Sequence, residues 1–353
     1  MKQKMDRKIF DSIKKPLRKL RAYARLLCTG IIQARAIRRL PNGSPRLRWT
    51  IDTAAPSGPE RELWGDTHFA NSLAAALQRL GQEVVVDPRE GRNRVSRSLD
   101  DVVLVLRGLD RVHPTPDTLN ILWIISHPDE ITREEVAEFD IVYAASESWA
   151  KQRSAEWGIA ISPLLQCTDS KLFNPRRGKQ GANSRVVFVG NSRGVERPVV
   201  AWAIAEGIPI EVYGSNWEPF IPAMFIAGTY VPNQRLGKLY AHADAVLNDH
   251  WLDMRDNGFI SNRIFDALAC GACVVSDYMP EIALLFGDSV RMFSSPSELS
   301  ELLQQPVQAR FPDWKTRVEI AQAVVSEHSF DTRAAVLLEA AAESCEKLKN
   351  RMS

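Results

Sequence analysis

The sequence predicts an α/β protein built from two doubly wound domains, and three observations support this. At 353 residues the chain exceeds one ordinary hydrophobic core and suits two domains. From Leu47 onward, short and nearly continuous apolar runs alternate with helical stretches, which is typical of parallel strands buried on both faces. A polar segment at 174–184, rich in Gly, Arg and Asn, interrupts the alternation, which then starts again. We therefore expect two domains joined by a linker.

The apolar runs give the expected strands in chain order. In the first half they cover 47–53, 83–87, 101–106, 120–126, 140–146 and 160–165. Helices are expected after the loop at 58–69, ending near Gly81, and over 147–157. In the second half strands are expected at 185–190, 208–214, 243–248, 273–277 and 289–293. The helices between them are expected at 195–206, 233–241, 261–270, from Pro280, and from about Pro296 to the end.

These elements divide the chain into four parts. We expect a basic helical extension at 1–46, a domain at 47–175, a second domain at 176–328, and a C-terminal helix at 329–353 that packs back toward the first domain. Ligands of such sheets bind at the carboxyl ends of the strands. The cleft between the two domains is therefore the expected site.

Charge is unevenly distributed along the chain. Residues 1–48 hold fifteen Lys and Arg against two Asp, while the remainder holds thirty basic and forty-one acidic residues. After Pro16, apolar residues recur at helical spacing between basic ones. Such a helix binds an anionic membrane surface, packs on the acidic body of the protein, or forms a solvated tail, and the sequence leaves these open. Nucleic acid is not expected as a partner, because the basic residues stop near Arg48 and no reading motif accompanies them.

Cysteine content and hydropathy favour a cytoplasmic protein, peripheral to the membrane at most. Five scattered cysteines are too few for a disulfide framework. No apolar run approaches the roughly 18 residues of a membrane-spanning helix. No apolar block of secretory-signal length follows the basic start.

The stretch 255–277 (RDNGFISNRIFDALACGACVVSD) carries the clearest chemistry. A polar loop leads into a helix capped by Ser261 and stopped by Gly271, and a buried strand follows. Asn262 and Asp266 lie one turn apart on one stripe, and Arg263 lies in the first turn, where the helix dipole favours an anion. The pattern predicts a seat for a diphosphate, with Asp266 placed to accept hydrogen bonds from a ribose diol. The alternative is that these are solvated surface residues.

The Cys270–Cys273 pair in this stretch has the spacing of a redox motif, but it does not lie at a helix start as such motifs do. A reactive cysteine usually begins a helix, where the dipole lowers the thiol pKa. Here Cys270 ends a helix and Cys273 begins a buried strand. We therefore expect two buried packing residues. Neither this pair nor the histidines have the spacing of a metal site.

Residues 248–282 resemble the donor-binding region of GT-B glycosyltransferases, in particular the CgeB-like group with its N-R-x-F-E-A-L-A-C-G-A type signature. Other stretches agree in order. The stretch 186–198 (VVFVGNSRGVERP) resembles the first strand and phosphate loop of that domain, 212–217 its second strand end, and 230–248 its base-contacting loop and helix. In the first half, 64–86 resembles the acceptor-side loop and helix. The resemblance spans about 49–342 and implies a GT-B fold of two Rossmann-like domains facing a cleft.

The resemblance implies a metal-independent transfer of sugar from a nucleotide diphosphate sugar to a glycan, lipid-linked or small-molecule acceptor. Asp266 takes the place of the family's ribose-binding Glu. Gly258 stands where many retaining members carry a second Glu, so the retaining course is open. We see no Asp-x-Asp at a strand end that would hold Mg²⁺ or Mn²⁺, and arginines stabilise a leaving diphosphate without metal. The expected donor-site residues are Gly190, Asn191, Arg193, Arg197, Gly214, Val231, Gly258, Phe259, Ile260, Asn262, Arg263 and Asp266, with the backbone N–H groups of 258–260 facing the diphosphate.

Three residues of the first half are candidate catalytic residues. His127 follows the strand at 120–126 and is followed by Pro128, so its imidazole can contact the donor sugar or deprotonate an acceptor hydroxyl. Asp66 and His68 are a second candidate pair on the acceptor side. Each of these residues is also compatible with a structural role. Two other functions stay open: a nucleotide-sugar epimerase of similar fold, and a non-catalytic scaffold.

Overall fold

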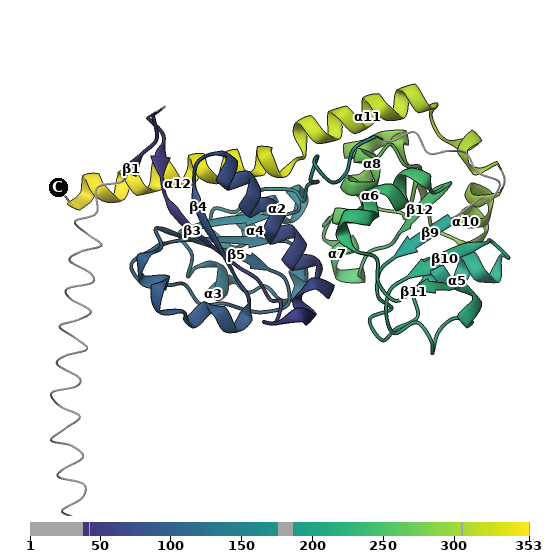
Figure 1. The fold of residues 1–353 in the computed structure, drawn as a ribbon, viewed down its shortest axis with the longest axis horizontal. Coiled ribbons are helices and arrows are strands. Elements are labelled where there is room, and N and C mark those ends of the chain that lie inside the picture. The colour runs from purple at the N-terminus through teal and green to yellow at the C-terminus, as the bar shows by residue number, and fades with distance from the viewer. Residues whose placement is uncertain (1–37, 42, 176–185, 305, 353) are drawn as a thin grey trace, which may run out of the picture.

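The computed structural model describes residues 38–41, 43–175, 186–304 and 306–352. These residues form two α/β domains that lie side by side, with the last two long helices running along both (Figure 1). The predicted fold class is thereby confirmed. The helix expected after Pro16 and most of the linker lie outside the described residues, so the proposed membrane contact of 1–46 stays a prediction.

The first domain contains a six-stranded parallel sheet in the order β4-β3-β5-β6-β7-β8. Its strands are β3 (Arg48–Asp52), β4 (Glu83–Asp87), β5 (Val102–Arg107), β6 (Leu119–Ile124), β7 (Ile141–Ala144) and β8 (Ser162–Pro163). Its helices are α2 (Gly65–Arg79), α3 (Arg133–Val136) and α4 (Glu147–Trp157), with short 3₁₀ turns η1 (Pro59–Leu63), η2 (Arg89–Asn93), η3 (Val95–Leu99) and η4 (Pro128–Glu130). A small hairpin, β1 (Arg38–Arg39) and β2 (Pro45–Arg46), precedes the sheet.

The second domain contains another six-stranded parallel sheet, in the order β11-β10-β9-β12-β13-β14. Its strands are β9 (Val186–Val189), β10 (Ile210–Tyr213), β11 (Ile226–Gly228), β12 (Ala245–Asn248), β13 (Val274–Asp277) and β14 (Val290–Phe293). Its helices are α5 (Pro198–Ala205), α6 (Asn233–His242), α7 (Leu252–Asp256), α8 (Asn262–Ala269), α9 (Pro280–Phe286), α10 (Pro296–Leu303) and α11 (Trp314–Glu327), with 3₁₀ turns η5 (Ala223–Phe225), η6 (Gly287–Ser289) and η7 (Val307–Arg310).

The strand orders locate a binding crevice in each domain. In the second sheet the order reverses between β9 and β12, and in the first between β3 and β5. Open α/β sheets bind ligands outside the carboxyl ends of the strands at such a reversal. Residues just after these four strands are therefore placed to form the site.

Local sequence explains where the helices begin and end. The Ser146 hydroxyl accepts a hydrogen bond from the Trp149 amide and caps α4, which stops at Gly158 in the left-handed region. Helix α8 is stopped by Gly271 at φ +70°, and a β-carbon there would lie 3.1 Å from the ring of Trp314. Cys270 and Cys273 are both fully buried on either side of this stop, as the sequence indicates for packing residues.

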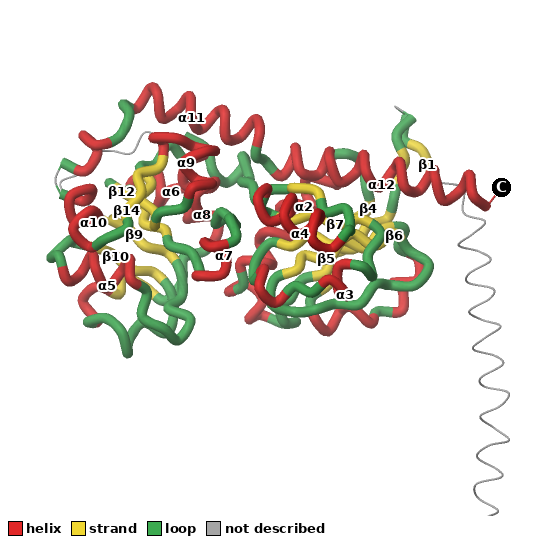
Figure 2. The backbone as a smooth tube through the Cα atoms, turned by 180° about the vertical axis from the view of Figure 1, so that it is seen from behind, coloured by secondary structure: helices red, strands yellow, loops and turns green. Residues whose placement is uncertain are grey.

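The chain ends by returning to the first domain. Helix α12 (Phe330–Met352) packs along α2, and its residues Phe330, Ala334, Leu337 and Ala341 belong to the hydrophobic core of the first domain. The Phe330 ring meets that of Phe69 at 4.7 Å between centroids. Figure 2 shows the same helix from behind, lying across the first domain. The two domains are therefore joined by two chain crossings.

The sequence did not predict a further packing contact between the two domains. The sequence predicted a loop at 255–260, but that stretch begins inside α7, and Met254 and Phe259 insert into a core cluster of the first domain. Phe259 is fully buried, with its ring 5.8 Å from that of Trp149. Sequence reasoning also missed β11, which is only three residues long. No helix in the described part of the chain is long and apolar enough to span a bilayer.

Candidate functional site

Three arginines converge at the strand-order reversal of the second sheet. Arg197 and Arg263 lie against the buried ring of Phe188 on β9, with guanidinium carbons 4.7 and 4.9 Å from the ring centroid. Arg193 lies over the ring of Trp251 at 4.5 Å. Aromatic faces hold cations without neutralising them. All three arginines are among the donor-site residues expected from the sequence, and their role in donor binding stays a prediction.

Gly190 makes this crowding possible. A β-carbon at Gly190 would lie 2.9 Å from the Arg263 Nη2 atom and 3.2 Å from the Arg197 Nη1 atom. Its carbonyl accepts the indole N–H of buried Trp217, and Asn191 binds the amide of Ser215 through its side-chain oxygen at 2.9 Å. The loop after β9 is therefore held by Trp217 and Ser215, and the absence of a β-carbon at Gly190 leaves room for the arginine side chains.

Gly214 is required next to this loop, because a β-carbon there would lie 2.2 Å from the Gly190 carbonyl oxygen. Its φ of +150° also disfavours other residues. Gly214, a predicted donor-site residue, thus adjoins the Gly190 loop beside the arginines. Val231, another predicted donor-site residue, is half-buried in the connection from β11 to α6.

The arginines differ in their partners. Arg197 pairs with the Asp249 carboxylate through Nε at 3.0 Å and through Nη2, and donates Nη1 to the Asn191 carbonyl at 3.0 Å. Arg263 instead donates Nη1 to the neutral side-chain oxygen of Asn248 at 2.8 Å. Among the residues that the structure describes, neither Arg193 nor Arg263 forms an ion pair. Two guanidinium charges are therefore left for a ligand.

This excess of positive charge is visible in the acid–base properties of the cluster. Burial and the neighbouring Arg197 and Arg263 charges lower the pKa of Arg193. Burial, with the charge of Arg197 adding to it, also lowers the pKa of Arg263. Both shifts mean that burial and mutual repulsion disfavour the charges of the cluster. A bound anion would remove that repulsion.

Asp266 is bonded to protein groups through both of its carboxylate oxygens. Its carboxylate accepts the Thr168 hydroxyl and the Asn262 side-chain amide, both at 2.8 Å, and the residue is 8% exposed. Burial raises its pKa well above the usual value. The Asn262 Oδ1 atom is buried and has no hydrogen-bond partner among the described residues. Each Asp266 oxygen thus already accepts one hydrogen bond from a protein group, and one lone pair on each oxygen is left for a further donor.

Two of the three amides at 258–260 that the resemblance implied for the diphosphate already donate within the chain. The Gly258 N–H donates to the Arg255 carbonyl at 3.3 Å, and the Phe259 N–H to the Met254 carbonyl at 2.9 Å. Phe259 and Ile260 are buried. This corrects the expectation for Gly258 and Phe259, because a loop closed onto α7 has spent these donors.

Gly258 itself faces the first domain. A β-carbon there would lie 2.6 Å from both the Glu281 Oε1 atom and the Ser148 hydroxyl, which bond each other at 2.9 Å. A carboxylate from α9 therefore lies beside the position where retaining relatives were expected to carry a Glu.

Sequence reasoning missed four polar residues behind the arginines, of which Asn248 and Ser276 are fully buried. They follow or end β12 and β13: Asn248, His250, Ser276 and Asp277. Their side chains form one hydrogen-bonded group that touches Arg263 at one end and the start of α8 at the other. The available signal was positional, since each lies at the carboxyl end of a correctly expected strand.

The candidate catalytic residues lie on the first domain. Asp66, in the first turn of α2, has its Oδ2 atom 3.4 Å from where a Gly108 β-carbon would be, at the end of β5. Burial and the nearby Asp110 charge raise the pKa of Asp66 to about 6. A carboxylate with such a pKa suits general base catalysis near neutral pH.

The two histidines have different surroundings. His127 has φ +52°, and its Nδ1 atom lies 3.7 Å from an Asp253 carboxylate oxygen of α7. It therefore projects from the first domain toward the second. The His68 Nε2 atom lies 2.9 Å from the Glu62 carbonyl, beside α2. Across the described ranges of the chain, no three His, Cys, Asp or Glu side chains are grouped as a metal site requires.

Comparison with known proteins gives the class. Residues 196–339, less than half of the chain, match a family model described as glycosyl transferase-like. Comparison with curated protein sequences finds none that matches.

Solved structures extend the likeness to nearly the whole chain. Sucrose-phosphate synthase from Thermosynechococcus elongatus has a TM-score of 0.58 at 11% identity, covering 87% of this chain and 99% of its own. The catalytic domain of starch synthase IV from Arabidopsis thaliana, bound to ADP and acarbose, has a TM-score of 0.55 at 10% identity, covering 87% and 99%. Phage T4 BGT with its UDP-glucose substrate has a TM-score of 0.54 at 13% identity, covering 84% and 99%, and another BGT structure contains UDP and Mn²⁺.

These comparisons agree with the fold. The fold is GT-B, and residues 196–339 are similar to the glycosyl transferase-like family. This segment begins just before Arg197 and includes Arg263, Asn248 and Asp277.

Proposed function

We propose that the chain transfers a sugar from a nucleoside diphosphate sugar to a hydroxyl of a glycan, lipid-linked or small-molecule acceptor. One observation carries the proposal: Arg193 and Arg263 have no carboxylate partner among the described residues, at the crevice where a doubly wound sheet binds ligands. The diphosphate of such a donor is a dianion at neutral pH. Two unneutralised guanidinium groups match it in charge and in hydrogen-bonding geometry.

The arrangement also suits the chemistry of the transfer. When the glycosidic bond breaks, negative charge develops on the leaving diphosphate. Fixed guanidinium groups, together with the first turn of α8, stabilise that charge without reorganising. On the opposite domain Asp66, with a pKa of about 6, takes the proton from the acceptor hydroxyl. A base in this role fits an inverting transfer, and the anomeric configuration of the product tests it against the retaining course.

We propose that no metal is needed, because the arginines supply the positive charge that a cation provides elsewhere. The Mn²⁺ in one BGT structure makes this point worth testing directly. Nucleoside diphosphates with uracil, guanine, cytosine and thymine bases are added to the protein in EDTA, Mg²⁺ or Mn²⁺. Thermal unfolding then measures binding, because a ligand of the folded state raises Tm.

One diphosphate should raise Tm by several °C in EDTA, and the matching nucleotide sugar should release that diphosphate when acceptor is present. Arg263→Ala should abolish most of the shift, whereas Arg255→Ala, at an exposed arginine of the same region, should not. If no diphosphate stabilises the wild type under any metal condition, the proposal is wrong. Conversion of the nucleotide sugar to an epimer without release would identify an epimerase, and binding without turnover would identify a scaffold.

A further inference from the structure

Behind the arginine cluster, the Asp277 carboxylate accepts hydrogen bonds from His250 and Ser276. Each of these bonds begins a series of contacts that leads to Arg263. Asp277 lies at the end of β13, and its side chain is 14% exposed. We propose that Asp277, His250 and Ser276 are positioning residues that aim Arg263 at the donor diphosphate without neutralising it. This inference rests on the proposed function and assigns roles to residues that do not themselves touch the ligand.

The first chain of contacts fixes the start of α8. Asp277 Oδ1 lies 2.7 Å from His250 Nδ1, and His250 Nε2 lies 3.0 Å from the Ser261 backbone nitrogen. A backbone N–H only donates, so Nε2 accepts and the imidazole proton is on Nδ1, directed at Asp277. The His250 side chain is completely buried. The residue preceding the first turn of α8 is thereby held in one place, and Arg263 is the second residue of that helix.

The second chain of contacts reaches the guanidinium group. The Ser276 hydroxyl donates to Asp277 Oδ1 at 3.0 Å and accepts the Asn248 side-chain amide at 3.0 Å. This leaves the Asn248 Oδ1 atom directed at Arg263 Nη1, at 2.8 Å. Asn248 and Ser276 are both fully buried. The amide of Asn248 therefore has one orientation, set by the hydroxyl behind it.

The Asp277 carboxylate keeps its charge but does not contact Arg263. Burial opposes its ionisation, yet hydrogen bonds from His250 and Ser276 hold its pKa below the usual value. Two neutral side chains separate this carboxylate from Arg263, whereas Asp249 contacts Arg197 directly. Direct contact would cancel the Arg263 charge. The relay supplies orientation and leaves that charge to the ligand.

The test compares Ser276→Ala in two backgrounds. This change removes one hydroxyl from the second chain of contacts and leaves the backbone and Asp277 in place. In otherwise wild-type protein we expect the Kd for the bound nucleoside diphosphate to rise about three- to tenfold, as loss of one buried hydrogen bond allows. In Arg263→Ala protein the same change should leave Kd unaltered, because the residue being aimed is gone. Ser326→Ala, at an exposed serine of α11, is the matched control.

Other results distinguish the positioning role of Ser276 from the proposed function. An equal rise of Kd in both backgrounds would mean that Ser276 only supports the fold and would overturn the inference. No rise in the wild-type background, with Arg263→Ala still impaired, would overturn it as well while sparing the proposed function. Wild-type protein that binds no nucleoside diphosphate would instead overturn the proposed function itself. If Arg263→Ala does not fold, Arg263→Gln provides the second background, with the same expected outcomes.

Discussion

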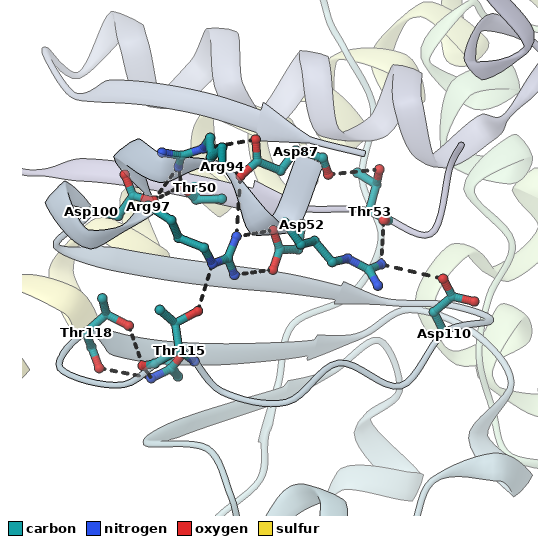
Figure 3. Close-up of polar contacts among 12 residues, drawn as sticks. Thr50, Asp52, Thr53, Asp87, Arg94, Arg97, Asp100, Asp110, Thr115 and Thr118 are labelled. Atoms are coloured by element: carbon teal, nitrogen blue, oxygen red, sulfur yellow. Dashed lines mark hydrogen bonds and ion pairs between the residues drawn. The ribbon is translucent and has the colours of Figure 1, made fainter. Parts of the chain in front are cut away.

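Both domains gather arginines at the carboxyl ends of their first strands, but the partners differ. In the first domain, Arg97 binds the fully buried Asp52 carboxylate at 2.6 Å and Asp87 at 3.3 Å (Figure 3). Arg94 binds Asp87 at 2.8 Å and also contacts the fully buried Asp100. Every guanidinium group in this cluster has a carboxylate. The cluster ties the η2–η3 segment to the sheet and leaves no charge for a ligand.

In the second domain, the only carboxylate hydrogen-bonded to the three arginines is Asp249, among the described residues. Arg263 has an amide partner and Arg193 an aromatic ring. The two halves of a pseudo-repeated fold thus use the same residue type in opposite ways. Arginine matched by carboxylate serves stability, and arginine matched by neutral groups is left able to bind an anion.

The largest expected effect comes from breaking the matched cluster. Asp52→Ala leaves Arg97 buried with only part of its compensation, and loss of one partner of a buried pair costs about 3–5 kcal/mol. We expect that decrease in the free energy of unfolding, measured by urea denaturation, with donor affinity per folded molecule unchanged. Arg235→Ala, at an exposed arginine of α6, should have almost no effect. A loss below about 1 kcal/mol would show that water solvates this cluster.

A smaller effect, in binding rather than stability, is expected from the unmatched cluster. Arg193→Gln removes one uncompensated charge at a residue that lies outside the hydrophobic core. We expect Kd for the nucleoside diphosphate to rise about tenfold, equal to about 1.4 kcal/mol. Its dependence on ionic strength, followed by calorimetry at several salt concentrations, should weaken too. An unchanged salt dependence would place Arg193 outside the site.

The smallest effect is a shift of a pH profile on the first domain. Asp66 has to be ionised to act as a base, so kcat/KM should rise about tenfold per pH unit below a midpoint of about 6 and level off above it. Asp110→Asn removes a repelling charge, which lowers the pKa of Asp66 and moves the midpoint to lower pH. The initial rate is measured between pH 4.5 and 8. A midpoint that does not move would argue against Asp66 as the base.

Strand positions were predictable because parallel strands buried on both faces are continuous apolar runs. The start of α8, with Arg263 in its first turn, was predictable from helix periodicity. The expected cap was wrong, because the Ser261 side chain forms no capping hydrogen bond among the described residues. In contrast, α7 has only five residues and a polar composition, so its single buried residue, Met254, gave no periodic signal. Asp266 lies on the stripe that periodicity indicated, but periodicity does not tell which neighbour that stripe meets.

By itself the sequence determined the two-domain α/β plan, the helix stop between Cys270 and Cys273, and the residue types at the strand ends. These depend on local hydrophobic patterning and backbone preference, which act over a few neighbouring residues. Only the tertiary structure decided which arginines lack a carboxylate, which residues aim Arg263, and that Phe259 packs on Trp149 of the other domain. Such outcomes depend on contacts between residues distant in sequence, and only the folded chain brings them together.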